Sequence, residues 1–311
     1  MTRRWYRGRR LPSIVISTMM ALCYVCVRLY VLQQSHVPDK QPPAKKKPIV
    51  SEQTRLTTQP SISPEQFNIR YKLNISNDGP LVLITSNKAF MDFAENWLES
   101  VHRLESRLNI FAIAEDMVAY RTFLRYPDVT TVMTQRAVSP QKRLAYLSHD
   151  YNVLINKRPV YIYRLLAKGR DVLFSDVDTV WLKDPLPHLD GDYDVVLQVD
   201  LRVPKVVYCA GFIFFRATNA SRAFVWEWID RIHKARDNIP DQKILNELLE
   251  ENFGDLRVKV LDSALFPNGA LYFDDKWRRT QTVKPVIVHN NWIEDHDEKV
   301  LRFKSHGFWF I

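Results

Sequence analysis

The sequence from Pro80 to the C-terminus predicts an α/β fold, and two observations support this class. Short apolar runs of strand length alternate with segments in which apolar residues recur at helical spacing. This order of strands and helices favours a parallel, doubly wound sheet. Polar residues follow directly on two of the apolar runs, at Ser86-Asn87 and at residues 175–178. Because such sheets bind ligands at the carboxyl ends of their strands, chemistry is expected at these two places.

The predicted elements follow one another in order along this part of the chain. The strands are the apolar runs 81–85, 110–114, 172–174 and 286–288. The helices, which follow from apolar residues three or four apart, cover 90–108, 117–124, 159–168 and 241–249. Gly169 stops the helix that leads into the third strand, since glycine is common at helix ends.

The excess of positive charge is confined to the N-terminus. Of the 44 lysines and arginines, ten lie within the first 47 residues, against one of the 35 acidic residues, so the rest of the chain carries 34 of each sign. A balanced domain is not expected to offer a basic groove, and no nucleic-acid partner is predicted.

The first 78 residues predict a membrane anchor and a stem. Five arginines within residues 1–10 precede an apolar segment at 11–32, which Arg28 interrupts. Positive charge before the segment predicts a cytosolic tail at 1–10, a transmembrane signal-anchor at 11–32 and a type II orientation. Prolines, lysines and polar residues at 33–78 predict a flexible stem, which leaves 79–311 as the lumenal catalytic domain. A cleaved signal peptide is the alternative, but no small-x-small cleavage site follows the run.

This topology has consequences for cysteines and asparagines. Only Cys209 would face the lumen, since Cys23 and Cys26 lie in the apolar run, so no intrachain lumenal disulfide is expected. Asn74-Ile-Ser76 and Asn219-Ala-Ser221 match the N-glycosylation tripeptide and become acceptors if the domain is lumenal.

Asp176-Val177-Asp178 carries the strongest chemical signal, because it follows directly on a predicted buried strand. Two carboxylates that leave water repel each other unless a positive charge lies beside them. A divalent cation bound through oxygen ligands satisfies that need and leaves positions for phosphate oxygens. A D-x-D tripeptide alone is common in solvated loops, so its placement after the strand gives it its weight.

Other motifs extend this signal in order from Leu81 to the C-terminus. They are Arg158-Pro159, Gly169, DVDTVWL at 176–182, Asp184-Pro185, CAGF at 209–212, Asp241-Gln242, FPNGALYF at 266–273, His289-Asn290-Asn291, Lys299, Arg302-Phe303 and GFW at 307–309. Together they resemble the nucleotide-diphospho-sugar transferases of glycosyltransferase family 77, and within it the plant UDP-xylose:fucose alpha-1,3-xylosyltransferases. The resemblance implies a GT-A fold (a Rossmann-like mixed sheet flanked by helices), manganese or magnesium, a UDP-sugar donor, a glycan or glycoprotein acceptor and retention of anomeric configuration. With the predicted anchor, the expected location is the Golgi membrane.

The resemblance also implies roles for single residues. A lone histidine at a strand end is more often structural, but His289 matches the histidine that completes the metal site with Asp176 and Asp178. An imidazole ligand suits Mn²⁺ better than Mg²⁺. Lys299 is expected to reach the diphosphate, with a solvated surface lysine as the alternative.

Asp241 and Gln242 form the second half of the expected catalytic set. From the residues alone, Asp241 is a plausible helix cap. The resemblance instead places Gln242 near the anomeric carbon of the donor and Asp241 on the sugar hydroxyls. Since glutamine forms no stable ester, transfer on the front face is favoured, in which the leaving phosphate helps to deprotonate the acceptor hydroxyl.

The remaining candidates concern the donor and the acceptor. Arg158 is expected to bridge the donor and a metal-binding carboxylate, with Lys157 as competitor. The predicted nucleotide contacts are Thr85, Ser86, Asn87 and, on uracil, Asp116; ordinary loop chemistry is the alternative for all four. Most aromatic residues near the C-terminus are expected in the core, but Trp292 is assigned to the acceptor side because it follows His289. Ser175 and Glu294-Asp295 depart from the family pattern, where Asn and Gly are expected.

Two other classes of function remain open at this point. Asp176-x-Asp178-Thr179-Val180 also fits the first motif of haloacid-dehalogenase-type phosphatases, although that fold normally opens with this strand. A non-catalytic, transferase-like lumenal binding protein is the third reading. Among donors, the resemblance favours xylose, with galactose and arabinose as neighbours.

Overall fold

The structure is a computed structural model that describes residues 79–134, 143–202 and 204–311. All of them belong to one compact unit of the chain, Pro60–Ile311. The predicted tail, anchor and stem, with Asn74, lie outside the described residues. Within the described ranges, every helix is too short or too polar to cross a lipid bilayer.

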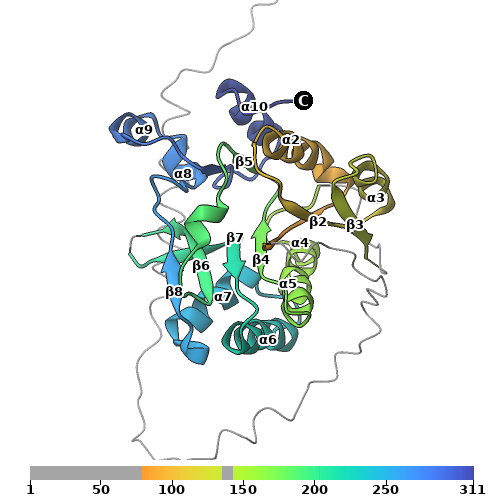
Figure 1. Ribbon diagram of the computed structural model, residues 1–311, viewed down its shortest axis with the longest axis vertical. Helices are drawn as coiled ribbons and strands as arrows, with labels where there is room; N and C mark the ends of the chain where they lie inside the picture. Colours follow the sequence, from red (N-terminus) through yellow and green to blue (C-terminus); the bar gives the residue numbers. More distant parts are fainter. Residues whose placement is uncertain (1–78, 135–142, 203) are drawn as a thin grey trace, which may run out of the picture. The chain divides into compact units, whose positions relative to one another are not determined.

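A seven-stranded sheet forms the centre of the fold, in the order β3-β2-β1-β4-β7-β6-β8 (Figure 1). Its strands are β1 (Leu81–Ser86), β2 (Asn109–Ala114), β3 (Val129–Met133), β4 (Val172–Ser175), β6 (Val195–Leu201), β7 (Val207–Phe215) and β8 (Val258–Val260). β1 to β4 pair in parallel, whereas β7 runs antiparallel to both β4 and β6. The mixed sheet implied by the family resemblance is therefore confirmed, and the purely parallel sheet suggested by the alternating pattern is wrong beyond β4.

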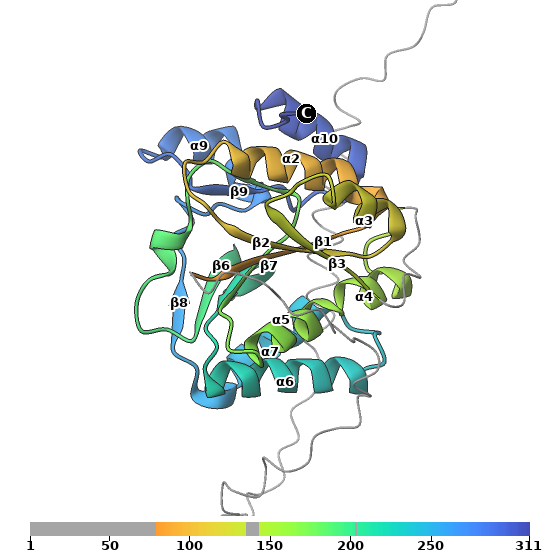
Figure 2. The ribbon, with the colours of Figure 1, turned by 45° about the vertical axis from the view of Figure 1, so that its right-hand side comes forward.

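Helices cover both faces of this sheet, with α2 and α10 on one side and α5, α6 and α7 on the other (Figure 2). Their bounds are α2 (Met91–His102), α10 (His296–Ser305), α5 (Arg158–Leu166), α6 (Asn219–Lys234) and α7 (Asp241–Glu250). Alternate residues of β1 point to opposite faces of the sheet, because successive side chains of a strand point in opposite directions. Val82 and Ile84 join the core under α2, and Leu81 and Leu83 join the core under α5 to α7.

Short helices fill the connections. They are η3 (Lys88–Phe90), α3 (Met117–Phe123), α4 (His149–Ile155), η4 (Leu186–Leu189), η5 (Phe253–Asp255), α8 (Gly269–Tyr272) and α9 (Asp275–Thr280). The predicted helix 90–108 ends early, at His102, while Gly169 follows the end of α5 with φ +75 as expected of a glycine stop.

A second, two-stranded sheet brings distant segments together, and the sequence did not predict it. β5 (Thr179–Trp181) pairs antiparallel with β9 (Ile287–His289), and Thr179 lies opposite His289. α2 supports the pair, since the Trp181 amide donates to the Ser100 hydroxyl at 3.2 Å and the Trp97 and Trp181 rings meet edge to face at 5.3 Å. This register places His289 beside the residues that precede β5.

Candidate active site

The segment between β4 and β5 turns sharply and exposes two carboxylates. The Asp176 amide donates to the Gly211 carbonyl at 2.7 Å, which extends the β4–β7 pairing by one residue. The Thr179 hydroxyl donates to the Asp176 carbonyl at 2.9 Å and closes the turn. Ser175, where the family resemblance leads us to expect asparagine, is buried and lies 2.9 Å from the same hydroxyl. The departure at Ser175 therefore supports the turn and does not disrupt it.

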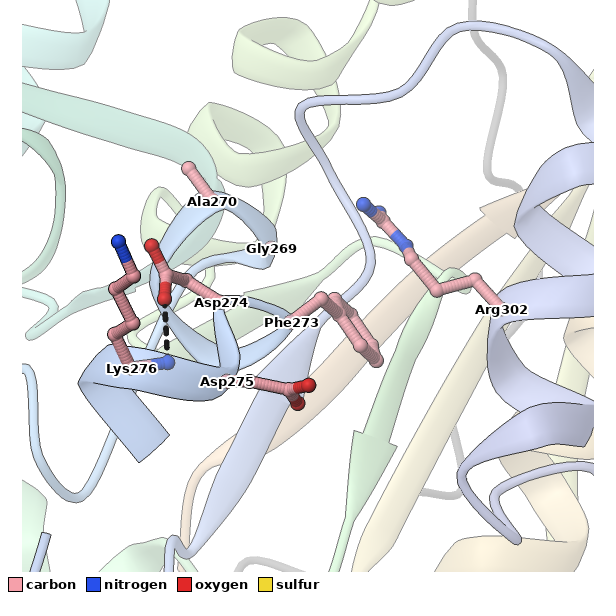
Figure 3. A pocket seen from close by; sticks show the side chains of 7 residues that line it. All are labelled: Gly269, Ala270, Phe273, Asp274, Asp275, Lys276 and Arg302. Atoms are coloured by element: carbon pink, nitrogen blue, oxygen red, sulfur yellow. Dashed lines mark hydrogen bonds between the residues drawn. The ribbon is translucent and has the colours of Figure 1, made fainter. Parts of the chain in front are cut away.

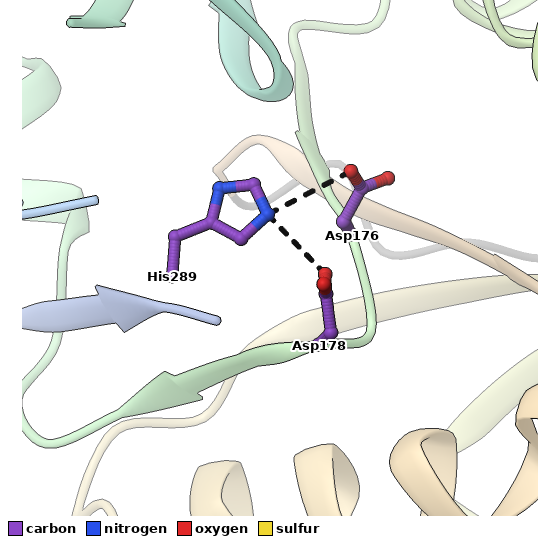
Figure 4. Close-up of side chains that lie close together, drawn as sticks. All are labelled: Asp176, Asp178 and His289. Carbon is purple, nitrogen blue, oxygen red and sulfur yellow. Dashed lines mark ion pairs between the residues drawn. The ribbon is translucent and has the colours of Figure 1, made fainter. Parts of the chain in front are cut away.

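Asp176, Asp178 and His289 converge at this turn (Figure 4). His289 Nε2 lies 3.2 Å from Asp178 Oδ1 and 3.8 Å from Asp176 Oδ2. Each residue offers one ligand atom within 4.8 Å of the others. Ligands that share an octahedral ion at bonds of about 2.1 Å lie roughly 3 Å apart, so the three groups are spaced to hold a divalent cation. His289 is buried while the Asp176 side chain is 33% exposed, which leaves one side open to a substrate.

Positive groups hold Asp178 in its charged form. Burial alone would raise the pKa of Asp178, but the Lys299 ammonium and His289 lower it well below its usual range. Lys299 Nζ donates to Asp178 Oδ2 at 2.5 Å. In this structure Lys299 therefore neutralises one of the carboxylates, whereas the sequence suggested a contact with phosphate.

Gln198, on β6, fixes the orientation of the His289 ring. Its side chain is fully buried, and its amide nitrogen donates to the carbonyls of Phe266 and Pro267 at 3.2 and 3.4 Å. The amide oxygen must therefore face His289 Nδ1, which lies 3.1 Å away. An acceptor at Nδ1 keeps a proton on that nitrogen, so Nε2 is the nitrogen that can give up its proton and bind a metal ion. Cys209, a free buried thiol, lies 3.6 Å from the same nitrogen.

Gly211, on β7, leaves the space that Asp176 occupies. A Cβ at this position would lie 2.1 Å from Asp176 Oδ2 and 2.7 Å from His289 Cε1. Any larger residue would therefore displace one of the carboxylates. The CAGF motif contributes to the site through this missing side chain.

Arg158 links this cluster to Asp241. Its guanidinium lies 3.3 Å from Asp176 Oδ1 and 3.3 Å from Asp241 Oδ2. Lys157, the competitor for this role, instead pairs with the buried Glu115 at 2.7 Å. Of the two neighbouring cations, Arg158 thus contacts Asp176 and Lys157 contacts Glu115, while the contact of Arg158 with the donor stays a prediction.

Asp241 is a buried carboxylate that faces the Arg158 guanidinium. Its side chain is 1% exposed, and burial raises its pKa to about 6, with Arg158 opposing and Asp176 adding to the rise. Pro240 is the N-cap of α7, so Asp241 does not cap its helix. Apart from its ion pair with Arg158, Asp241 Oδ2 accepts no hydrogen bond from the described residues, and Arg158 Nε donates none to them. Buried polar atoms with unused hydrogen-bonding capacity favour a site for hydroxyl groups of a ligand.

Gln242 is held at both ends of its amide. The Ala210 amide donates to its oxygen at 3.0 Å, and its nitrogen donates to Asp200 Oδ2 at 2.9 Å. The expected catalytic residues Asp176, Asp178, Asp241 and Gln242 thus belong to one contiguous cluster, which Arg158 and β7 connect.

The loop after β9 is fixed from α10 and α8. Arg302 donates to the Asn290 side-chain oxygen and to the Asn291 carbonyl, both at 2.6 Å, and the Gly269 amide donates to Asn291 Oδ1 at 2.7 Å. Asp295 caps α10 by accepting from the Glu298 amide at 2.9 Å. The departure from glycine in this loop therefore starts the helix that carries Lys299.

A hollow of about 490 Å³ adjoins the loop (Figure 3). Its lining residues are Gly269, Ala270, Phe273, Asp274, Asp275, Lys276 and Arg302.

Three of the predicted nucleotide contacts, Thr85, Ser86 and Asn87, lie at the carboxyl end of β1, next to β4 in the sheet, and the fourth, Asp116, follows β2. Ser86 and Asn87 are buried there, and Thr85 is partly exposed. Asp116 caps α3 by accepting from the Ala119 amide at 2.9 Å, and it also accepts from the Lys88 amide at 2.7 Å. Both oxygens of Asp116 are therefore occupied by backbone donors, and its contact with uracil stays a prediction.

Aromatic residues lie at the open side of the site. Trp292 is 51% exposed, and its indole nitrogen donates to Asp200 Oδ1 at 2.9 Å. Tyr146 and Tyr151 stack edge to face at 5.3 Å, and the sequence did not single them out. Burial, then the Asp176 charge, raises the pKa of Tyr151; burial, then Asp200, raises the pKa of Tyr146.

The second glycosylation tripeptide falls on a helix start. Asn219 is exposed at the first position of α6, whereas Ser221 is fully buried and donates to the Asp194 carbonyl at 3.1 Å. Glycan attachment at Asn219 stays a prediction.

Sequence comparisons identify the family to which this site belongs. The family model for nucleotide-diphospho-sugar transferases matches residues 105–303. UDP-D-xylose:L-fucose alpha-1,3-D-xylosyltransferase 3 of Arabidopsis thaliana is 28% identical over 261 residues, covering 76% of this chain and 68% of that protein. UDP-galactose:fucoside alpha-3-galactosyltransferase of Dictyostelium discoideum is 26% identical and covers 77% of this chain, but the match spans only 44% of that protein.

A comparison with solved structures shows the same fold. The glycosyltransferase GlyE of Streptococcus pneumoniae superposes with a TM-score of 0.50 at 15% identity, covering 76% of this chain and 61% of that chain. The present chain thus spans less than two thirds of that bacterial protein, and the likeness concerns the fold alone. The resemblance read from the motifs is confirmed, and the phosphatase reading finds no support. The chain belongs to the nucleotide-diphospho-sugar transferase family and is a glycosyltransferase with a GT-A-like mixed α/β sheet.

Proposed function

We propose that the protein is a metal-dependent, retaining glycosyltransferase that moves a sugar from a UDP-sugar to a hydroxyl group of a glycan. The convergence of Asp176, Asp178 and His289 at the carboxyl end of the sheet carries this proposal. Two carboxylates and one imidazole suit Mn²⁺, with Mg²⁺ as the alternative. A bound ion would neutralise the negative charge that develops on the diphosphate as the sugar leaves.

The chain's own residues supply the remaining contacts to the donor. Lys299 pairs with Asp178 here, and a divalent ion at this carboxylate would release its ammonium to reach the diphosphate. Asp241 Oδ2 and Arg158 Nε, which make no hydrogen bond with the described residues, would meet hydroxyl groups of the donor sugar. Thr85, Ser86, Asn87 and Asp116 remain our candidates for the nucleoside.

We further propose that transfer occurs on the front face of the donor. Asp241 is paired with Arg158, and Gln242 forms no stable ester, so neither residue is a good covalent nucleophile. The bond from the anomeric carbon to the phosphate oxygen breaks as the acceptor oxygen bonds to that carbon on the same face. The acceptor proton passes to the departing phosphate, and UDP leaves. A glycosyl adduct on Asp241, detected by mass spectrometry, would overturn this route.

The relatives suggest the sugars. The Arabidopsis relatives are named for xylose transfer to fucose, the Dictyostelium relative for galactose transfer to a fucoside and a further relative as an arabinosyltransferase. We therefore propose xylose as the favoured donor sugar, with galactose or arabinose possible, and a glycan or glycoprotein acceptor that bears fucose. The half-exposed Trp292 would contact this acceptor, since aromatic faces pack against the apolar face of a pyranose ring.

A donor screen with the full-length chain tests the proposed function. UDP release is measured with UDP-xylose, UDP-galactose and UDP-arabinose, with Mn²⁺ and with chelator, in the presence of a fucoside. We expect release with one donor, dependent on Mn²⁺ and lost in Asp178→Ala at an unchanged melting temperature. Phosphate release from a model ester without any UDP-sugar would favour the phosphatase reading. Donor binding without turnover would favour a non-catalytic lumenal binding protein.

The cellular setting is part of the proposal. We propose a type II protein of the Golgi membrane, with a cytosolic tail at 1–10, a membrane anchor at 11–32, a stem at 33–78 and glycans at Asn74 and Asn219. Protease protection of residues 79–311 in sealed microsomes, and a mobility shift on removal of N-linked glycans, would support this topology. Digestion of the catalytic domain from the cytosolic side would contradict it.

A further inference from the structure

The Asp200 carboxylate, at the end of β6, accepts hydrogen bonds from three residues in two separate parts of the chain. Its Oδ2 accepts from Gln242 of α7 at 2.9 Å. Its Oδ1 accepts from the side-chain amide nitrogen of Asn291 and from the indole nitrogen of Trp292, both at 2.9 Å. One carboxylate thereby joins α7 to the loop that follows β9. Neither the D-x-D motif nor the expected catalytic set includes this residue.

The contact with Gln242 has a defined direction. Because the Ala210 amide donates to the Gln242 oxygen at 3.0 Å, the nitrogen of the same side chain must face Asp200. A carboxylate accepts at both oxygens and donates nothing, so it fits this nitrogen without ambiguity. The amide that we assign to the donor side is thus held by Asp200 at one end and by β7 at the other.

Trp292 combines exposure with backbone strain. Its φ of +61 is unusual for a residue other than glycine, and half of its side chain is exposed. Such a conformation persists only where its surroundings fix it, and fixed strain of this kind clusters at functional sites. The bond from the indole to Asp200 orients a large aromatic ring that would otherwise move freely in solvent.

The frame around Asp200 is itself rigid. Asn268 donates to the Asp200 carbonyl at 2.6 Å, and Asn291 accepts from the Gly269 amide at 2.7 Å while donating to Asp200. A Cβ at Gly269 would lie 2.0 Å from the Asn291 carbonyl, which shows how closely the two segments are packed. The Asp200 carboxylate therefore sits in a network that has little freedom to relax around a substitution.

We propose that Asp200 is a positioning residue that holds Trp292 and Gln242 in one hydrogen-bonded unit, so that the acceptor ring meets the donor at a fixed place. The inference rests on the proposed function, which assigns Trp292 to the acceptor side and Gln242 to the donor side. The ligand recognised through this unit is a pyranoside whose apolar face packs on the indole, with the reacting hydroxyl directed toward Gln242.

Asp200→Asn tests this unit directly. An asparagine keeps the size of the side chain, but its NH₂ group must face either Gln242 or the Asn291–Trp292 pair. On that side two N–H groups face each other, and no hydrogen bond can form between them. We expect the acceptor KM to rise about tenfold or more, since a charge-assisted hydrogen bond is lost. Mn²⁺ affinity should stay unchanged, because among the described residues the Asp200 carboxylate is hydrogen-bonded to Gln242, Asn291 and Trp292 and not to the three metal-site residues.

Trp292→Phe is the matched variant that does not threaten folding, because the side chain is half exposed. It keeps an aromatic face and removes the indole N–H that donates a hydrogen bond to Asp200. We expect it to raise the acceptor KM as well, and the double variant to be no worse than the more affected single variant, since both changes break the same bond. In the NMR spectrum, the indole N–H signal that Trp292→Phe removes should shift in Asp200→Asn.

The outcomes separate the two levels of the proposal. An acceptor KM within twofold of wild type in Asp200→Asn, or additive effects in the double variant, would overturn the positioning role. If the indole signal shifts in Asp200→Asn but Trp292→Ala leaves the acceptor KM unchanged, the assignment of Trp292 to the acceptor is wrong, and the positioning of the acceptor by Asp200 falls with it. Neither result would affect donor cleavage, which the donor screen tests separately.

Discussion

Gly211 offers a sharp test of the metal site, because a methyl group at this position would overlap with a carboxylate ligand and with the imidazole ligand. In Gly211→Ala, the new Cβ would lie 2.1 Å from Asp176 Oδ2 and 2.7 Å from His289 Cε1. Ordinary contact between such atoms begins at about 3.4 Å, so Asp176 Oδ2 must retreat by roughly 1 Å. Metal–ligand distances tolerate only about 0.2 Å. The variant is therefore expected to lose Asp176 as a ligand.

The size of the effect follows from this loss. Removal of one of three protein ligands is expected to weaken Mn²⁺ binding about 100-fold, which corresponds to about 2.7 kcal/mol. The overlap also strains the buried middle of β7, and overpacking of this kind costs about 1–3 kcal/mol of folding stability. The assay is a titration of Mn²⁺, followed by the paramagnetic resonance signal of the free ion, with thermal unfolding measured without metal.

Gly269→Ala is the matched control, since its Cβ would create a similar overlap, at 2.0 Å, with the Asn291 carbonyl and not with a carboxylate. We expect this variant to raise the acceptor KM and to bind Mn²⁺ within a few fold of wild type. If Gly211→Ala binds Mn²⁺ as tightly as wild type while remaining folded, Asp176 is not a ligand and the reasoning is refuted.

Three further predictions follow from the contacts of the site. Lys299→Met should leave Mn²⁺ binding without donor unchanged or tighter, because it removes a cation that competes for Asp178. The same variant should raise the KM for the UDP-sugar about tenfold, because the diphosphate loses a positive partner. If Mn²⁺ affinity and UDP-sugar affinity both fall, the proposed release of Lys299 is contradicted. Gln198→Met should weaken Mn²⁺ binding about 10- to 100-fold in the same titration, because His289 loses the acceptor that fixes its ring, and an unchanged affinity would show that the ring needs no such partner. Burial raises the pKa of Asp241 to about 6 from 3.8. Between these two pKa values the folded protein keeps a proton that the unfolded chain has lost. The free energy of unfolding should therefore fall as pH rises, by about 2–3 kcal/mol between pH 4 and pH 7.5. Urea unfolding of Asp241→Asn should lack this decline, and a parallel pH dependence in both proteins would disprove the raised pKa.

The sequence predicted three of the four parallel strands well, because β1, β2 and β4 are apolar runs followed by polar residues, but it missed β3, in which two threonines interrupt the apolar run. It placed β1, β2 and β4 within a residue or two of their observed bounds. It did not predict that β5 pairs with β9, since a pairing between distant segments leaves no local pattern in either one. That pairing is nevertheless what brings His289 to Asp178.

The candidate site was predictable where a motif marks it and hidden where a residue acts through another. Asp176, Asp178 and His289 could be proposed from motifs, and the structure brings them together. Gln198 and Asp200 lie in an ordinary strand pattern, and their importance appears only through hydrogen bonds to residues at least 42 positions away. A possible signal was the presence of two polar residues, three and one positions before the end of an otherwise apolar β6.

A titration of Mn²⁺ with the full-length chain, with and without UDP, tests the central claim most directly. The account predicts one bound ion, held more tightly when UDP is present because the diphosphate completes its coordination, and little binding in His289→Ala or Asp178→Ala. If these variants bind the ion as wild type does, or if sugar transfer proceeds at full rate in chelator, the claim that these three side chains hold the ion and the donor diphosphate is contradicted.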